Sequence, residues 1–499
     1  MIAALKAAER RRWEFAALLL VVAGYIFVAS SYARHGTIHN DEGFYAEASR
    51  EVMRGRIPYR DFAYTQTPVL PYVQGVVMAV VGYGVREQRW INVAWSALAI
   101  AVALLIWRRA GLNCVTCLGF ICAWFCPQLV YYSTIGKTYG LAQFFLLIAA
   151  RALYLRGPAP AKLWLLSTAC VLAIGCRLTV APAALLLWCG LASTERGRLS
   201  LPSLVGVPVL LLILVLGPFI AADPGNAYFW LLGCHLQDAL PKLRLEKLGE
   251  SLTATLPVTV LAAFGLLVMF SLRARFTRPS FWIFSAGVAG WLLGVGVPGI
   301  YADYAMPFLP LVIVGAGCLL AEATTQWVQR FCLVMVLALT GFSLLQKHYL
   351  LSGGYLEAVD RTAAYVRANT KVDDVVLTSM PETAVVAGRK VYPALEMGKF
   401  GFTGEMDQRT AHRRHTLTWA DLNEAIETQR APIIVLSRHQ GVNFSWSLPS
   451  LLSLAPPDYR GFAERLLRRY HCTYADDFFL VFERAEAKPK AFAINPDAL

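Results

Sequence analysis

Apolar stretches long enough to cross a bilayer as helices alternate with short polar segments through the first 350 residues. We predict about eleven membrane-spanning helices, at 13–33, 90–107, 114–132, 141–155, 163–176, 180–192, 204–222, 254–272, 281–297, 305–321 and 331–349. Residues 351–499 mix charged and apolar positions as water-soluble domains do. The pattern therefore predicts a transmembrane module at 1–350 and a globular domain at 351–499.

The loops between these segments alternate in charge. If the N-terminus is cytoplasmic, each short inward loop is basic, as with Arg108 and Arg109 or Arg273 and Arg275. This agrees with the positive-inside rule. We therefore expect a multi-pass protein of the cytoplasmic (inner) membrane, with the first outer loop (34–89) and residues 351–499 on the extracytoplasmic side.

The composition supports a membrane protein, because 57% of the 499 residues are hydrophobic and only 16% are charged. The net charge of +13 could indicate nucleic-acid binding. The basic residues, however, lie in short clusters between apolar segments, where they act as topology signals. We expect membrane lipids, and no nucleic acid, among the partners.

The first outer loop (34–89) is long and rich in aromatic residues and prolines. At its start, Phe44, Tyr45, Ala48 and Val52 fall on one face of a predicted helix, which ends near Gly55. An amphipathic helix lying on the membrane fits this pattern. We predict that the apolar piece at 69–85 is a second interfacial segment, because a span there would invert the charge of all later loops.

Asp41 and Glu42 stand where this first helix begins. Carboxylates at a helix N-terminus complement the free amides and the helix dipole, and this alone would explain both residues. The same position would also hold Asp41 ionised beside His39, where it could act as a base or a cation ligand facing a lipid headgroup. The local pattern leaves both interpretations open.

Lys137, Arg177 and Asp303 lie at predicted outer ends of spans, and few ionisable residues fall near the membrane midplane. Arg177 requires a tight outward turn between two short spans, since it would be costly in lipid. This distribution places any chemistry at the outer surface. A transporter or flippase of lipid-linked sugars, the alternative function, would be expected to carry polar groups and broken helices at mid-membrane.

Several short motifs together resemble the GT-C glycosyltransferases of the family 39 type, which include protein O-mannosyltransferases and the lipid A aminoarabinose transferase. The motifs are His39-Asn40-Asp41-Glu42 with Tyr45, Ala48, Gly55, Pro58-Tyr59, Asp61 and Pro68; Tyr132-Ser133 with Lys137 and Tyr139; Gly175-Cys176-Arg177-Leu178-Thr179; and the segment from Tyr304 to Pro310. They cover most of the first two thirds of the chain, in the expected order.

The resemblance implies transfer of a sugar from a polyprenyl-phosphate donor to a glycan, lipid or protein acceptor outside the membrane, with inversion at the anomeric carbon. Asp41 matches the catalytic carboxylate, either as a general base or through a metal. Lys137 and Arg177 are then expected to bind the donor phosphate. The remaining matched polar and aromatic residues are expected to bind substrate: Glu42, Tyr45, Tyr59, Asp61, Tyr139 and Tyr304.

The sequence departs from the family pattern in three places. Some relatives have a glutamate near Gln66 and an acidic residue near Lys137, which help to hold a divalent ion, and this chain has neither. A divalent metal at Asp41 therefore stays open, and no other cofactor is implied. Asp303 stands where an arginine often precedes the tyrosine, and we predict that Asp303 pairs with Lys137 or Arg177.

Residues after 355 alternate helix and strand patterns. A helix is predicted over 356–366, strands over 375–377, 432–436 and 478–482, and a helix opened by a capping box at Thr418 and Asp421. This predicts a small extracytoplasmic α/β domain. Because no glycine-rich phosphate loop follows a strand, a nucleotide-dependent activity is disfavoured. We expect this domain to help select the acceptor.

Overall fold

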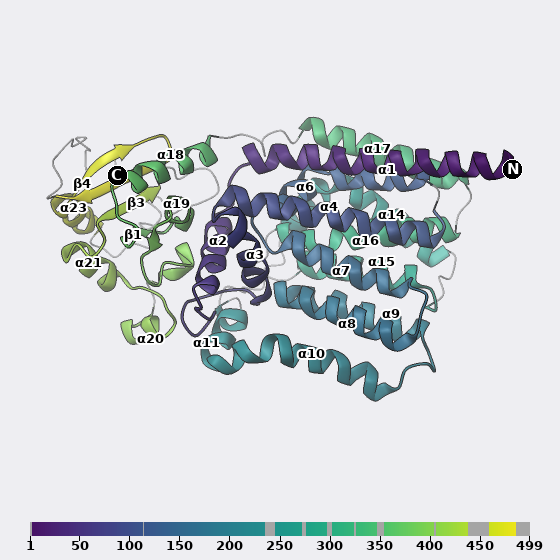
Figure 1. The fold of residues 1–499 in the computed structure, drawn as a ribbon, viewed down its shortest axis with the longest axis horizontal. Coiled ribbons are helices and arrows are strands. Elements are labelled where there is room, and N and C mark those ends of the chain that lie inside the picture. The colour runs from purple at the N-terminus through teal and green to yellow at the C-terminus, as the bar shows by residue number, and fades with distance from the viewer. Residues whose placement is uncertain are drawn as a thin grey trace. The chain divides into compact units, whose positions relative to one another are not determined.

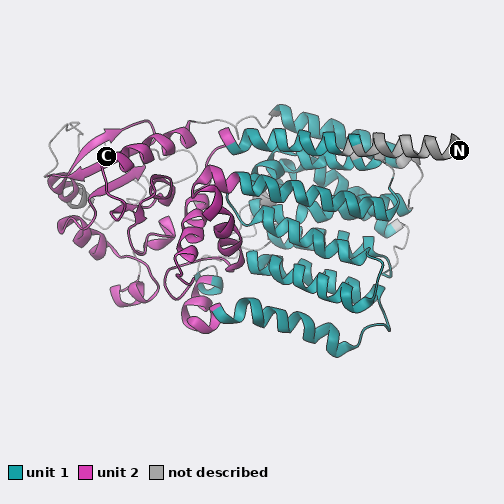
Figure 2. Ribbon diagram, in the orientation of Figure 1, with its two compact units in different colours: residues 1–33, 90–218, 231–351 teal, residues 34–89, 219–230, 352–499 magenta. Residues whose placement is uncertain are grey.

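Apolar segments of the chain fold as helices in a computed structural model, which describes residues 2–112, 114–234, 245–271, 276–296, 302–323, 326–346, 354–403, 406–437 and 459–485. The chain divides into two compact units (Figure 2). Unit 1 comprises residues 1–33, 90–218 and 231–351, and unit 2 comprises residues 34–89, 219–230 and 352–499. The first outer loop thus belongs to the same unit as the C-terminal residues.

Long helices run alongside one another in unit 1 (Figure 1). Their bounds are α1 (Ile2–His35), α4 (Val85–Ala110), α7 (Tyr139–Leu153), α8 (Ala159–Cys176), α9 (Ala181–Thr194), α10 (Leu201–Ala222), α14 (Leu256–Ser271), α15 (Pro279–Gly296), α16 (Leu309–Ala323) and α17 (Gln326–Gln346). Shorter helical pieces are α13 (Leu245–Ala254), η2 (Leu178–Val180), η3 (Phe229–Gly233) and η4 (Ala302–Phe308). Helical structure therefore accounts for the predicted spans, except for ends at 272, 297 and 347–349 that lie outside the described residues.

Within the described part of the chain, four helical segments are long and apolar enough to cross a membrane: Val85–Ala110, Ala159–Cys176, Leu201–Ala222 and Asp303–Glu322. Seven further apolar helices there are shorter. Repeated helices of this kind confirm the prediction of a multi-pass membrane protein.

The predicted span at 114–132 is not one continuous helix. It consists of α5 (Cys114–Cys122), η1 (Ala123–Phe125) and α6 (Pro127–Thr134). Cys126 departs from helical geometry, with ψ of 121°, and Pro127 then opens α6. Proline lacks an N–H and disrupts the preceding turn, so the apolar run breaks here although its hydrophobicity is uninterrupted.

Close helix contacts in unit 1 depend on glycine. A Cβ on Gly315 would lie 2.5 Å from the backbone of Phe284, and one on Gly287 would lie 2.5 Å from the amide nitrogen of Val312. These glycines bring the backbones of α15 and α16 together, as small residues do between membrane helices. The contact fixes the N-terminal part of α16, which follows directly after η4.

The first outer loop folds as two helices in unit 2, α2 (Asn40–Met53) and α3 (Val69–Val81), which pack on each other. Helix α2 forms at the place where the spacing of apolar residues predicts a helix. Its polar residues Glu47, Arg50 and Glu51 are also buried, which the amphipathic pattern did not indicate. Part of the reason is α19 (Pro381–Ala387), which packs on α2. A Cβ on Gly43 would lie 2.8 Å from the amide nitrogen of Glu382, so glycine permits this approach.

The C-terminal part of unit 2 is an α/β domain, as predicted. Its five-stranded sheet has the order β2-β1-β3-β5-β4, with β1 parallel to β2 and β3 and with β5 antiparallel to β3 and β4. The strands are β1 (Val375–Thr378), β2 (Lys390–Val391), β3 (Ile433–Ser437), β4 (Tyr470–Ala475) and β5 (Phe479–Arg484). The helices are α18 (Tyr355–Ala368), α20 (Gln408–Arg413), α21 (Trp419–Glu427) and α23 (Tyr459–Arg469), together with α19. Strands β2 and β4 were not predicted.

Candidate functional site

A buried cluster of charged and aromatic side chains lies in unit 1, around the N-terminus of α7. Lys137 Nζ donates a hydrogen bond to Asp303 Oδ2 at 2.7 Å, and the Tyr139 hydroxyl donates to the same oxygen at 2.7 Å. Lys137 and Asp303 are 2% and 3% exposed, so this is a buried ion pair. The predicted pairing of Asp303 with one of the two cations is confirmed, with Lys137 as the partner.

The loop that carries Lys137 is held by α4. Asn92 Nδ2 donates to the main-chain oxygens of Ile135 and Lys137, and Ser96 Oγ donates to that of Ser133. Gly140 lies against the same helix, since a Cβ there would be 3.5 Å from the carbonyl oxygen of Asn92. These bonds fix the backbone on which the Lys137 side chain stands.

Arg177 occupies the predicted turn between two apolar helices. Helix α8 ends at Cys176, Arg177 is extended, and η2 follows before α9. Its guanidinium donates to the hydroxyls of Thr179 at 3.0 Å and Thr138 at 3.4 Å. The guanidinium carbon lies 4.4 Å from the ring centroid of Tyr304 and 4.9 Å from that of Tyr139.

These contacts bring four of the predicted site residues into one cluster of unit 1: Lys137, Tyr139, Arg177 and Tyr304. Within this cluster the carboxylate of Asp303 forms an ion pair with Lys137. A snorkelling cation would place its charge in water, whereas Arg177 is only 2% exposed and lies against two rings. The burial and stacking favour a binding role over a purely topological one.

Asp41 lies in unit 2, at the start of α2. The capping roles fall to its neighbours: His39 Nδ1 accepts from the Asp41 amide at 3.3 Å, and Glu42 accepts from the His39 amide at 2.7 Å. The Asp41 carboxylate lies 3.6 Å from His39 Nδ1 and is 19% exposed. Asp41 is thus a partly exposed carboxylate at the positive end of a 14-residue helix, a place that favours its charged form.

Glu42 has a different environment from Asp41. Both of its oxygens accept from Arg89, each at 2.7 Å, and both side chains are fully buried. Arg89 also donates to the main-chain oxygens of Gly36 and Thr37. The structure therefore gives Glu42, predicted to bind substrate, a role in fastening the loop ahead of α2.

The other predicted substrate residues of the first loop form part of its internal framework. Tyr45 and Tyr59 are buried around the ring of Tyr64. Asp61 Oδ2 accepts from the Ile57 amide at 2.7 Å and pairs with Arg60, whose hydrogen bond lowers the pKa of the Asp61 carboxyl. These contacts give Asp61 the role of a turn residue.

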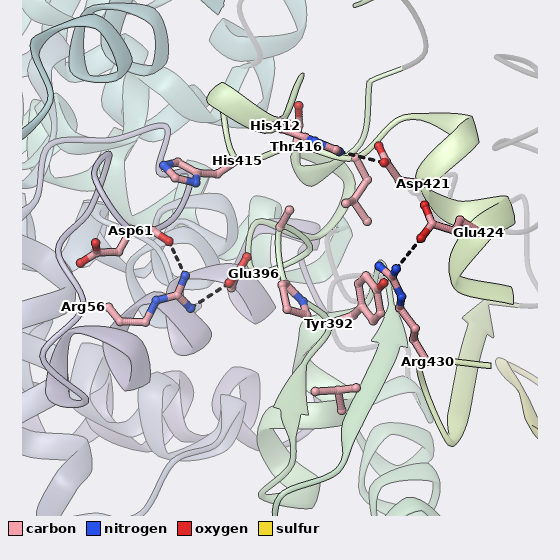
Figure 3. A pocket seen from close by; sticks show the side chains of 14 residues that line it. Arg56, Asp61, Tyr392, Glu396, His412, His415, Thr416, Asp421, Glu424 and Arg430 are labelled. Atoms are coloured by element: carbon pink, nitrogen blue, oxygen red, sulfur yellow. Dashed lines mark hydrogen bonds and ion pairs between the residues drawn. The ribbon is translucent and has the colours of Figure 1, made fainter. Parts of the chain in front are cut away.

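A polar cavity of about 750 Å³ lies within unit 2, between the loop after α2 and the C-terminal domain (Figure 3). Most of its charged side chains are paired with one another: Arg56 with Glu396 at 2.8 Å, His412 with Asp421 at 2.8 Å, and Arg430 with Glu424. His415 also lines the cavity, and burial lowers its pKa despite hydrogen bonds to the backbone of Tyr59 and Arg60.

The fold was compared with solved structures. The crystal structure of ArnT from Cupriavidus metallidurans bound to undecaprenyl phosphate aligns with a TM-score of 0.67, covering 94% of this chain and 98% of that chain at 14% identity. The apo state of the same protein aligns with a TM-score of 0.63 over 93% of this chain and 97% of that chain, also at 14% identity. The chain has a GT-C fold. No family model and no curated protein matches the sequence.

A metal site is not apparent in the described part of this GT-C fold. There, no three His, Cys, Asp or Glu side chains are placed to hold a metal ion. His39 and Asp41 supply two such groups, whereas Glu42 is engaged by Arg89. Among the described residues, Asp41 and His39 are therefore fewer than the three groups of a protein-held metal site.

Two residues that hold predicted site residues in place were missed from the sequence. Asn92 is a polar residue inside an otherwise apolar span, and this signal could have singled it out. Arg89 stands at the outer end of the same helix and resembles an ordinary interfacial cation. Its two hydrogen bonds to Glu42 join residues 47 positions apart, so no local sequence pattern could predict this pair.

Proposed function

We propose that this protein is an inverting glycosyltransferase that uses a polyprenyl-phosphate sugar as donor and acts at the outer face of the cytoplasmic membrane. The observation that carries the proposal is the buried cluster of Lys137, Tyr139, Asp303 and Arg177 in a chain with a GT-C fold. Buried cations at helix ends are costly unless an anion offsets them, and a lipid phosphate would do so.

In this proposal Arg177 and Lys137 bind the phosphate of the donor. The planar guanidinium can donate two parallel hydrogen bonds to phosphate oxygens, while the ammonium supplies a point charge held in place by Asp303. As the sugar leaves, negative charge grows on the bridging oxygen, and fixed cations stabilise it. The solved ArnT structure with undecaprenyl phosphate supports the choice of a polyprenyl carrier.

Asp41 would accept the proton of the attacking hydroxyl. The acceptor oxygen forms a bond to the anomeric carbon from the face opposite the phosphate, and the bond between that carbon and the phosphate oxygen breaks. The electron pair leaves with the polyprenyl phosphate, and the hydroxyl proton passes to the Asp41 carboxylate. One displacement of this kind inverts the anomeric configuration. Glu42, held by Arg89, supports the helix that presents Asp41.

The polar cavity of unit 2 would bind the acceptor. Its lining combines polar side chains with the ring of Tyr392, and the pairing of its charges leaves little net charge, which suits an uncharged, hydroxyl-rich ligand. Substituting Tyr392→Ala should raise the KM for the acceptor and leave the KM for the donor unchanged. An unchanged acceptor KM would refute this part of the proposal.

The experiment that tests the activity incubates purified protein with a panel of polyprenyl-phosphate sugars and acceptors, and measures the new glycosidic bond. Asp41→Asn should lower kcat by about 10²- to 10⁴-fold, the range for a lost general base. Asp360→Asn is the matched control, because Asp360 is a surface carboxylate of the same unit that pairs with Arg86.

The outcomes separate the leading function from its alternative. Full transfer by Asp41→Asn would refute the role of that carboxylate. Movement of a lipid-linked sugar across vesicle membranes by the wild type, without any new bond, would refute the transferase and support a flippase. Lipid extracted from the purified protein should contain a polyprenyl phosphate.

A further inference from the structure

A second cavity of unit 2, of about 510 Å³, is lined by four arginines. Arg50 lies in the last turn of α2, and Arg54 directly follows that helix. Arg367 lies in α18, and Arg389 directly precedes β2. Tyr83 and the end of α19 complete the lining, and none of the described residues that line it is acidic. Three distant segments of the chain thus place their arginines around one cavity.

Arg50 is buried, with 5% of its surface exposed. Its Nη2 atom forms an ion pair with Glu47 Oε2 at 2.6 Å, whereas its Nε atom is buried and has no hydrogen-bond partner among the described residues. Burial raises the pKa of the Glu47 carboxyl, which weakens its pairing with Arg50. A buried donor without an acceptor is costly, and an anion in the cavity would supply the acceptor.

Arg367 and Arg389 bring charge that no carboxylate of the described residues neutralises. Arg367 Nε and Arg389 Nη1 each donate to the Ala387 carbonyl at 3.3 Å, at the C-terminus of α19. These bonds satisfy donors but leave the positive charge, because carbonyl groups are neutral. Capping of α19 explains why these two arginines are there. It does not explain why Arg50 and Arg54 of another helix line the same cavity.

Arg54 is paired with Glu51 at 2.6 Å, but Glu51 is shared with Arg56. The carboxylates near the cavity are therefore fewer than its guanidiniums. Guanidinium groups bind phosphate through paired hydrogen bonds, and clusters of them are typical of phosphate recognition. The volume is within the range of small-ligand pockets.

We propose that the cavity lined by Arg50, Arg54, Arg367 and Arg389 binds a phosphate-bearing anion, either free in solution or as the headgroup of an anionic lipid. The site contains none of the residues assigned to the donor or to proton transfer. It therefore stands independently of the proposed glycosyl transfer.

The test removes the charges of the two exposed arginines of the cavity and keeps those of the two buried arginines. Arg54 and Arg367 are exposed at the cavity, so the double variant Arg54→Gln/Arg367→Gln should fold. The matched control is Arg409→Gln/Arg468→Gln, which removes two exposed arginines elsewhere in unit 2. Thermal unfolding without ligand checks that both variants fold.

Two probes distinguish the source of the phosphate. Pyrophosphate is titrated by calorimetry into detergent-purified protein, and binding to phosphatidylglycerol vesicles is compared with binding to phosphatidylcholine vesicles. Each titration is repeated with Arg177→Gln in the background, which removes phosphate bound at the proposed donor site. The cavity variant should bind about tenfold more weakly or worse, while the control should stay within about twofold of wild type.

Loss of pyrophosphate binding in the cavity variant alone would identify a free phosphate ligand. Loss of preference for phosphatidylglycerol alone would identify a lipid headgroup. The proposal is overturned if neither probe binds the wild type, or if the cavity and control variants lose affinity equally.

Discussion

Lys137 and Asp303 form a buried ion pair, 2.7 Å from Nζ to Oδ2, between the residue two positions before α7 and the 3-10 segment before α16. The same carboxylate oxygen accepts from Tyr139, so one acidic residue orients two side chains of the candidate site. Asp303 is therefore the residue on which the geometry of this cluster depends. Asp303 is also one of the residues at which the sequence departs from the family pattern. The sequence predicted that it would pair with Lys137 or Arg177.

A double-mutant cycle should detect this pair. Lys137→Met and Asp303→Asn should each lower thermal stability, because each leaves a buried polar group without its partner. The double variant should lose less than the sum of the two, with a coupling of about 0.5–3 kcal/mol. Thermal unfolding of the detergent-purified wild type, the two single variants and the double variant measures the four stabilities that the cycle needs. Additive losses would contradict a direct interaction.

The stacking of Arg177 on two rings predicts that lysine cannot replace it. Arg177→Gln should lower kcat/KM for the donor by about 10²-fold or more, as loss of a charge-stabilising donor does. Arg177→Lys keeps the charge but not the planar fork or the stack on Tyr139 and Tyr304, so it should recover only part of that loss. Steady-state kinetics at varied donor concentration decide this. Wild-type activity in Arg177→Lys would show that charge alone suffices.

Local sequence patterns predicted the helices and strands of this molecule better than they predicted the tertiary contacts between them. The 14-residue helix α2 follows from the spacing of Phe44, Ala48 and Val52, and the capping box of Thr418 and Asp421 opens α21 as its residues indicate. Both signals act within one or two helical turns. Strand β2 has only two residues, too few for a period to show.

Tertiary partners carry no such local signal. The pairing of Glu42 with Arg89 and the packing of α19 on α2 join segments that the sequence treats as separate. Asp41 and Glu42 are adjacent and chemically similar, and only the structure distinguishes a partly exposed carboxylate from a buried, paired one. For the same reason the four-arginine cavity, built from three segments, was not predicted.

Loss of Arg89 should destabilise the fold far more than loss of its neighbour Arg86. Arg89→Met leaves Glu42 buried without its charge partner, which costs about 3–5 kcal/mol in comparable buried pairs. Arg86→Met breaks exposed pairs with Glu357 and Asp360, worth about 0–1 kcal/mol. Melting temperatures of the two variants measure the difference. Equal melting temperatures would argue against a structural role for the Glu42 pair.

The pH dependence of stability should report the contact between α2 and α19. Burial raises the pKa of the Glu382 carboxyl to about 8, and the nearby charge of Glu42 adds to this effect. An acid whose pKa is higher in the folded state than in the unfolded state keeps its proton on folding. Its contribution to stability is therefore full below the unfolded pKa near 4.5 and is lost as pH rises toward about 8.

Melting temperature should accordingly fall between about pH 5 and pH 8, and Glu382→Gln should flatten that decline because the amide cannot ionise. The variant should be more stable than wild type at the alkaline end, where the wild-type carboxylate is charged and buried. Glu424→Gln is a suitable control, since Glu424 is an exposed partner of Arg430. A decline of the same steepness in Glu382→Gln and wild type would assign the pH dependence to other groups.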